Sequence, residues 1–236
     1  EKLSSGYRIN RAGDDAAGLA ISEKMRGQVS GMNQAVRNAQ DGISLIQTSE
    51  AALEEVQSMV QRMRTLAIQA ANDTNVTSDR SQMQTELIEL ASEINRIAST
   101  TEFNTRPLLG GFGALFSGII HIGANSGQNM KITINNMTSS FLGVSVTKYA
   151  TPDYSGFATG QDPTKPGMQA FSVMTQSDAD IAISSLDNAL ASVSTQRAKL
   201  GAWQNRLEHT ISNLSVGEEN LQAAESIIRD ANMANQ

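Results

Sequence analysis

Residues 32–70 read MNQAVRNAQDGISLIQTSEAALEEVQSMVQRMRTLAIQA, with an apolar or small side chain at every third or fourth position. A mean spacing of about 3.5 residues keeps one stripe of a helix facing a single neighbour along its whole length. These roughly 40 residues would form about 60 Å of unbroken helix. The predicted buried stripe comprises Met32, Ala35, Ala39, Gly42, Ile46, Ser49, Leu53, Val56, Val60, Met63, Ala67 and Ala70.

The segments on either side of this helix have different characters. Before it, the run 6–18 contains Gly6, Gly13 and Gly18, so we expect it to be weakly helical and in part extended or mobile. After it, the polar stretch 72–79 (NDTNVTSD) favours a turn and the N-cap of another helix. A short loop makes two helices antiparallel. The second helix should bury Met83, Leu87, Leu90, Ile94 and Ile97.

A third apolar stripe lies in residues 177–236. Ser177 and Asp180 are spaced like a capping box at the start of a helix. Polar side chains on such a stripe either fix the register of the helix or face solvent. Here they are Arg197, Gln204, Glu218 and Glu225. The predicted core residues of this helix are Leu186, Leu190, Val193, Leu200, Trp203, Leu207, Ile211, Leu214, Leu221 and Ile228.

The middle of the chain is irregular, because residues 103–171 hold all four prolines, eight of the ten aromatic residues and ten of the 18 glycines. Apolar residues alternate with others over 120–124 and 131–135, on either side of a turn at 125–129, which predicts a β-hairpin. The predicted fold is therefore mainly α with a small β region. Two N-terminal helices and one long C-terminal helix form an elongated antiparallel bundle, with a β-hairpin and a loop-rich excursion. We divide the chain into 1–147, a short variable excursion at 148–176, and 177–236 of the same domain.

Composition argues against catalysis and against several classes of partner. The 236 residues carry a net charge of −6, so a nucleic-acid partner is not expected. No apolar run is long enough to span a membrane. Cysteine is absent, and the two histidines, His121 and His209, have no second histidine at metal-ligand spacing. We expect both to be solvated, and we predict no enzyme activity, no metal and no cofactor.

Several motifs together resemble bacterial flagellin. They are LSSGYRIN at 3–10, DDAAGLAI at 14–21, NAQDGIS at 38–44, TEFN at 101–104, IGAN at 122–125 and LGAWQNRL at 200–207. The resemblance covers about 1–147 and 176–236, in the family's order. Flagellins normally carry a further helical segment at each end, and these pack into the innermost tube of the filament. The resemblance therefore implies a core fragment that lacks the terminal filament-core helices.

This resemblance implies a secreted structural subunit of the bacterial flagellar filament, acting in motility outside the cell. Its implied partners are other flagellin subunits and the flagellar export machinery with its chaperones. Two alternatives remain open: a hook–filament junction protein, and another secreted helical scaffold. A spectrin-like scaffold would show a repeat of fixed period, and the helical flanks show none.

The resemblance also implies recognition by host toll-like receptor five. The family's receptor-contacting positions correspond to Arg62, Leu66 and Glu86. Arg62 and Leu66 are four residues apart and so share one helix face. An exposed arginine beside an apolar side chain is typical of a binding hot spot. The residues alone favour a bridge between Arg62 and Glu86 that joins two helices on a solvated face. The resemblance reverses this preference and favours the receptor site.

Overall fold

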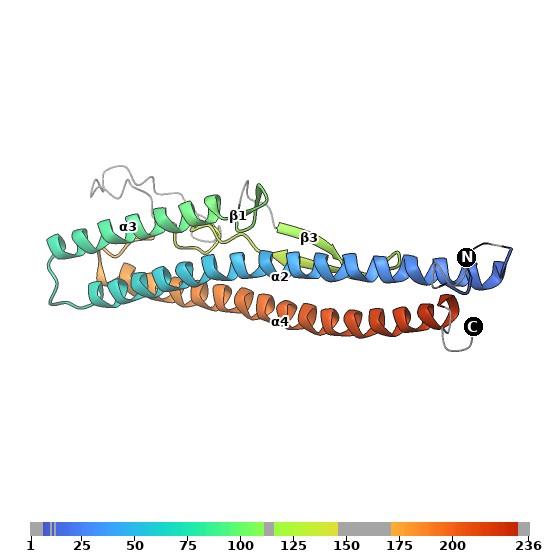
Figure 1. Cartoon of the computed structure of the whole chain (residues 1–236). Coiled ribbons are helices and arrows are strands. Elements are labelled where there is room, and N and C mark those ends of the chain that lie inside the picture. The colour runs from blue at the N-terminus through green and yellow to red at the C-terminus, as the bar shows by residue number, and fades with distance from the viewer. Residues whose placement is uncertain (1–6, 10, 12, 111–115, 146–170, 231–236) are drawn as a thin grey trace. The chain divides into compact units, whose positions relative to one another are not determined.

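The computed structural model describes residues 7–9, 11, 13–110, 116–145 and 171–230 (Figure 1). As predicted, the protein is mainly α-helical, with helices α2 (Ala16–Ala70), α3 (Thr77–Thr100) and α4 (Gln176–Arg229). The described residues form two compact units. Unit 1 takes its residues from Glu1–Ser44, Gly118–Ile132 and Ala202–Gln236, and unit 2 from Leu45–Ser117 and Thr133–Gly201. Helices α2 and α4 contribute to both units.

Helix α2 buries the stripe that its sequence predicts. All twelve predicted residues are buried, from Met32 to Ala70. The helix begins earlier than expected, at Ala16, so the prediction of a weakly helical run is wrong from that residue onward. The reason is a side-chain cap: Oδ1 of Asp15 accepts the backbone N–H of Gly18 at 2.8 Å.

Helix α3 is capped from within its first turn. Val76 at the N-cap has no side-chain oxygen, and the Asp79 carboxylate accepts the Val76 N–H at 3.2 Å. Met83, Leu87 and Ile94 are buried as predicted, but Leu90 and Ile97 are only half-buried. In each case the next residue is an alanine, Ala91 or Ala98, and it is buried instead. The buried stripe therefore runs through Met83, Leu87, Ala91, Ile94 and Ala98.

Helix α4 begins at Gln176, one residue before the predicted cap at Ser177. The hydroxyl of Thr175 accepts the Asp178 N–H at 3.1 Å, so Thr175 is the N-cap residue. Leu186, Val193, Leu200 and Leu207 are buried as predicted.

Two residues placed in the core of α4 are only half-buried, Leu190 and Trp203. Ala189 occupies the inward position beside Leu190 and is 1% exposed. Trp203 lies on the stripe, but an indole is so large that it is seldom covered completely. In the part of α4 that the structure describes, no residue after Leu207 is buried, so Ile211, Leu214, Leu221 and Ile228 are also half-buried.

The predicted β-hairpin is confirmed, with β3 (Phe116–His121) paired to β4 (Asn129–Ile134). Burial alternates along both strands, and Gly127 in the turn has a φ of 83°. A second, unpredicted hairpin pairs β1 (Glu102–Phe103) with β2 (Arg106–Pro107). Most of the predicted excursion, residues 148–170, lies outside the described residues. Its last part is not an excursion, because Phe171 and Val173 are buried in unit 2.

Candidate functional site

The predicted receptor site brings together α2 and α3 in unit 2. The Arg62 Nε lies 2.7 Å from Oε1 of Glu86, and the two side chains are 55% and 42% exposed. The hydrogen bond from Arg62 to Glu86, with the attraction of that carboxylate, raises the pKa of the Arg62 guanidinium. The pair is therefore a charged bridge between two helices on a solvated face.

Leu66 does not share this exposure. Its side chain is 2% exposed, because position 66 lies next to the buried stripe of α2. The surface beside Arg62 is instead polar along α2, with exposed Glu55, Ser58, Thr65 and Gln69 spaced by threes and fours. We call these four residues with Arg62 and Glu86 the α2–α3 polar face.

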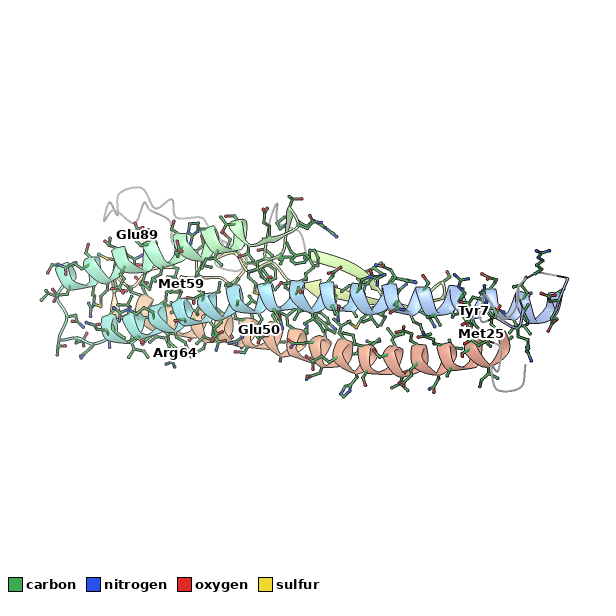
Figure 2. All side chains as sticks on the ribbon, viewed as in Figure 1. Tyr7, Met25, Glu50, Met59, Arg64 and Glu89 are labelled. Carbon is green, nitrogen blue, oxygen red and sulfur yellow. The ribbon has the colours of Figure 1, made fainter. Side chains whose placement is uncertain are left out.

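The opposite flank of α2 in unit 2 is tied to α4 by three polar contacts. Arg64 Nε lies 2.6 Å from Oδ1 of Asp187. Arg197 donates to Oε1 of Gln57 at 2.8 Å and lies 3.6 Å from Glu50. Figure 2 shows Glu50 and Arg64 on the α4 side of α2, and Met59 on the α3 side. Arg197, a polar residue on the predicted stripe, thus fixes the register of α4 against α2.

Gln84 makes a buried contact that the sequence did not reveal. Its side chain is 4% exposed and holds a segment that follows 87 residues later. Oε1 accepts the N–H of Val173 at 2.8 Å, and Nε2 donates to the carbonyl of Phe171 at 3.3 Å. One side-chain amide thereby satisfies two backbone groups, as a neighbouring β-strand would.

In unit 1 the β3–β4 hairpin packs against α2 at two glycines, Gly31 and Gly42. A Cβ on Gly31 would meet the Cβ of Ala124 at 3.0 Å and its Cα at 3.2 Å. A Cβ on Gly42 would meet the end of Ile120. Between the two glycines, Asn38 donates to the carbonyl of His121 at 3.1 Å. The two glycines on α2 therefore admit the hairpin, and Asn38 fixes its position.

The end of α4 in unit 1 is capped by a segment from the beginning of the chain. The Arg8 N–H donates to the carbonyl of Arg229 at 2.7 Å, and its guanidinium donates to the carbonyl of Ile228 at 2.8 Å. Arg229 stacks on the ring of Tyr7 at 4.8 Å and pairs with Glu23 at 3.2 Å. Arg8 thus satisfies carbonyl groups that the last turn of a helix leaves without partners.

The described residues offer little for catalysis. Both histidines are exposed, His121 on β3 and His209 on α4. Within the described ranges, no three His, Asp or Glu side chains are placed to hold a metal ion. In the same ranges no helix is long and apolar enough to cross a membrane.

Comparisons with known proteins identify the family of this chain. Residues 1–114 match the family model of the bacterial flagellin N-terminal helical region, and residues 183–236 match that of the C-terminal helical region. The flagellin of Halalkalibacterium halodurans is 49% identical, over 99% of this chain and 77% of that protein. A crystal structure of Bacillus cereus flagellin aligns with a TM-score of 0.56 at 27% identity, covering 75% of this chain and 88% of that one.

The hook-associated alternative shares the fold alone. The structure of a putative flagellar hook-associated protein from Vibrio parahaemolyticus aligns with a TM-score of 0.66 over 92% of this chain and 99% of that chain, at only 16% identity. The family models and the much higher identity to a flagellin decide between the two. The chain therefore belongs to the bacterial flagellins, the non-enzymatic structural subunits that build the extracellular flagellar filament and serve motility.

Proposed function

We propose that, besides its structural role, this flagellin is a ligand of host toll-like receptor five through the α2–α3 polar face. The observation that carries the proposal is the Arg62–Glu86 pair. Both side chains are about half exposed, and they are held in one geometry by a 2.7 Å charged hydrogen bond. A fixed guanidinium loses less rotamer freedom on binding than a mobile one, which favours its use as an anchor.

Leu66 has a different role in this proposal from the one its sequence position indicates. Because its side chain is 2% exposed, it supports α2 from the inside and does not contact the receptor. We therefore expect Leu66→Ala to act through stability, at a cost of roughly 2–5 kcal/mol typical of a buried leucine. The contact residues are then Arg62 and Glu86, with the exposed polar residues of α2 around them.

Receptor activation by alanine variants tests the proposal. We expect Arg62→Ala and Glu86→Ala each to weaken activation of reporter cells about tenfold or more, as hot-spot residues do. The thermal melt should hardly change, because exposed ion pairs contribute about 0–1 kcal/mol. Arg96→Ala is the matched control, since Arg96 forms a similarly exposed pair with Glu93 on α3. Full activation by Arg62→Ala, or an equal loss in Arg96→Ala, would contradict the assignment.

We further propose that the flagellar export apparatus and its chaperones are partners of the unfolded chain. Family membership supports this, and so does the absence of cysteine, because no disulfide can hold the chain in a folded loop before passage. The test is secretion from a strain whose export apparatus is inactive. The protein should remain inside those cells; normal release into the medium would argue against the route.

A further inference from the structure

The turn of the β3–β4 hairpin holds an asparagine that can react with its own backbone. Asparagine is a thermolabile residue, because its side-chain amide can be attacked by the next backbone nitrogen when a small residue follows. Three asparagines precede a residue as small as alanine or serine, namely Asn38, Asn125 and Asn188. Asn38 and Asn188 lie inside α2 and α4, where a helix hydrogen bond holds the following N–H. Only Asn125, before Ser126, lies in a turn.

This turn leaves both reacting groups free. The side chain of Asn125 is exposed and makes no hydrogen bond to any described residue. The backbone N–H of Ser126 likewise donates to no described acceptor. Gly127 has a φ of 83° and open space around its Cα, and the turn is closed by a long hydrogen bond of 3.4 Å from the Gln128 N–H to the Asn125 carbonyl. The local backbone can therefore move enough for the two groups to meet.

We propose that Asn125 is a site of spontaneous deamidation in the folded protein. The Ser126 nitrogen bonds to Cγ of the Asn125 amide, the bond from Cγ to Nδ2 breaks, and ammonia leaves with the proton of the Ser126 N–H. The product is a five-membered succinimide ring. Water then adds to one of the two ring carbonyl carbons and opens the ring. Opening on the side-chain side gives aspartate, and opening on the main-chain side gives isoaspartate, without any oxidation or reduction.

The isoaspartate product changes the main chain of the turn, because it inserts one carbon and converts the former Asn125 carbonyl into a free carboxylate. That carbonyl accepts the Gln128 N–H, and the Asn125 N–H donates to Oε1 of Gln128 at 2.9 Å. The preceding residue, Ala124, packs so closely on α2 that a Cβ on Gly31 would lie 3.0 Å from its own. Isoaspartate therefore loosens this end of the hairpin from α2, whereas aspartate adds only a charge.

This inference goes beyond the receptor proposal and does not rest on it. Asn125 belongs to unit 1, whereas Arg62 and Glu86 belong to unit 2. The reaction needs only water, so it proceeds in the purified protein without receptor or filament.

Peptide mass spectrometry of the folded subunit, kept for days in mildly alkaline buffer, provides the test. Asn125 should convert at least about tenfold faster than Asn129, an exposed asparagine of the same hairpin that precedes the large Met130. The rate at Asn125 should also stay within about tenfold of its rate in urea, because an exposed turn is already mobile. Conversion of Asn125 only in urea, or no faster than that of Asn129, overturns the proposal.

Substitutions of Ser126 change the attacking nitrogen and keep the turn. Position 126 is second in a turn whose third residue has a positive φ, a place where proline is common. Proline has no backbone N–H, so Ser126→Pro should abolish the conversion of Asn125. Ser126→Gly should speed it about tenfold, because glycine has no side chain to hinder the attack. An unchanged rate in either variant overturns the proposal.

Hydrogen exchange of the aged protein tests the effect on the hairpin, since peptides with aspartate and with isoaspartate separate in chromatography. Amides of residues 122–130 should exchange about tenfold faster in the isoaspartate peptide than in the unmodified one. The aspartate peptide carries the same added charge and should exchange like the unmodified one; the variant Asn125→Asp identifies it. Equal exchange of all three peptides overturns the loosening of the hairpin.

Discussion

At the scale of single residues, the tip of the β1–β2 hairpin shows the most evident backbone strain. Asn104 and Thr105 have φ angles of 50° and 63°. A two-residue hairpin turn with both φ angles positive is common for Asn-Gly, because asparagine and glycine tolerate that conformation. A β-branched threonine does not, and it sits there at a cost of about 1–3 kcal/mol.

Replacing the strained threonine should stabilise the protein. We expect Thr105→Gly to raise the free energy of unfolding by about 1 kcal/mol, the strain relieved less the greater freedom of glycine in the unfolded chain. Urea denaturation followed by circular dichroism measures the change. Thr105→Ala removes the β-branch but still requires a positive φ, so its gain should be smaller. A loss of stability in Thr105→Gly would show that the turn is not strained.

Two glycines of α2 differ only in what surrounds them, and they make a matched pair. Gly27 has open space where a Cβ would be, so Gly27→Ala should stabilise by about 1 kcal/mol through helix propensity. At Gly31 the new Cβ would press on Ala124 of the hairpin segment, and we expect Gly31→Ala to lose that gain or to destabilise. Thermal melts of the two variants provide the comparison. Equal gains would mean that the hairpin is not held closely against α2.

At the scale of elements, the segment 171–173 depends on one side chain of α3. Gln84→Ala leaves the Val173 N–H and the Phe171 carbonyl without their partner in a buried place. Each buried polar group left unpaired costs about 1–3 kcal/mol, so we expect a loss of about 2–4 kcal/mol in the free energy of unfolding. Chemical denaturation measures it. Gln82→Ala on the exposed side of α3 is the control and should change stability by less than about 0.5 kcal/mol.

The long helices could be predicted from the sequence, because the buried positions of α2 are the apolar or small residues that recur every three or four positions. The same reasoning failed where tertiary contacts choose between neighbouring positions. Ala91 is buried and Leu90 is half-buried, because the neighbouring elements admit a small side chain at that place. The contacts of Gln84 join residues 87 or more apart, and no local pattern announces them. The candidate site was found through a family resemblance, which gave Arg62 and Glu86 but could not show that Leu66 is covered.

At the scale of the whole molecule, the two units differ in how much they bury. In the described part of α4, the residues of unit 2 include buried Leu186, Val193 and Leu200, whereas no residue after Leu207 is buried. Local opening is easiest where few apolar side chains are covered. The end of α4 in unit 1 combines half-buried apolar side chains with polar contacts such as Arg229 with Glu23 and Asn33 with Glu218.

Hydrogen exchange should report this difference directly. We expect amides of α4 beyond Leu207 to exchange at least about tenfold faster than those of α4 between Leu186 and Leu200, under native conditions in the dissociated subunit. Mass spectrometry of peptic peptides measures both stretches in one sample. Uniform protection along α4 would show that polar contacts stabilise unit 1 as well as the apolar core stabilises unit 2.

Two polar pairs join α2 to α4, Asn33 with Glu218 and Arg64 with Asp187, and they restrict how the lengths of these helices can change. From Asn33 to Arg64 in α2, and from Asp187 to Glu218 in α4, the chain advances by the same 31 residues. One inserted residue in either helix rotates the rest of that helix by about 100° and shifts it by one residue along its axis. The two pairs can then no longer form together. Insertions or deletions inherited by these helices should therefore come as matched events, one in each helix and each a whole multiple of seven residues.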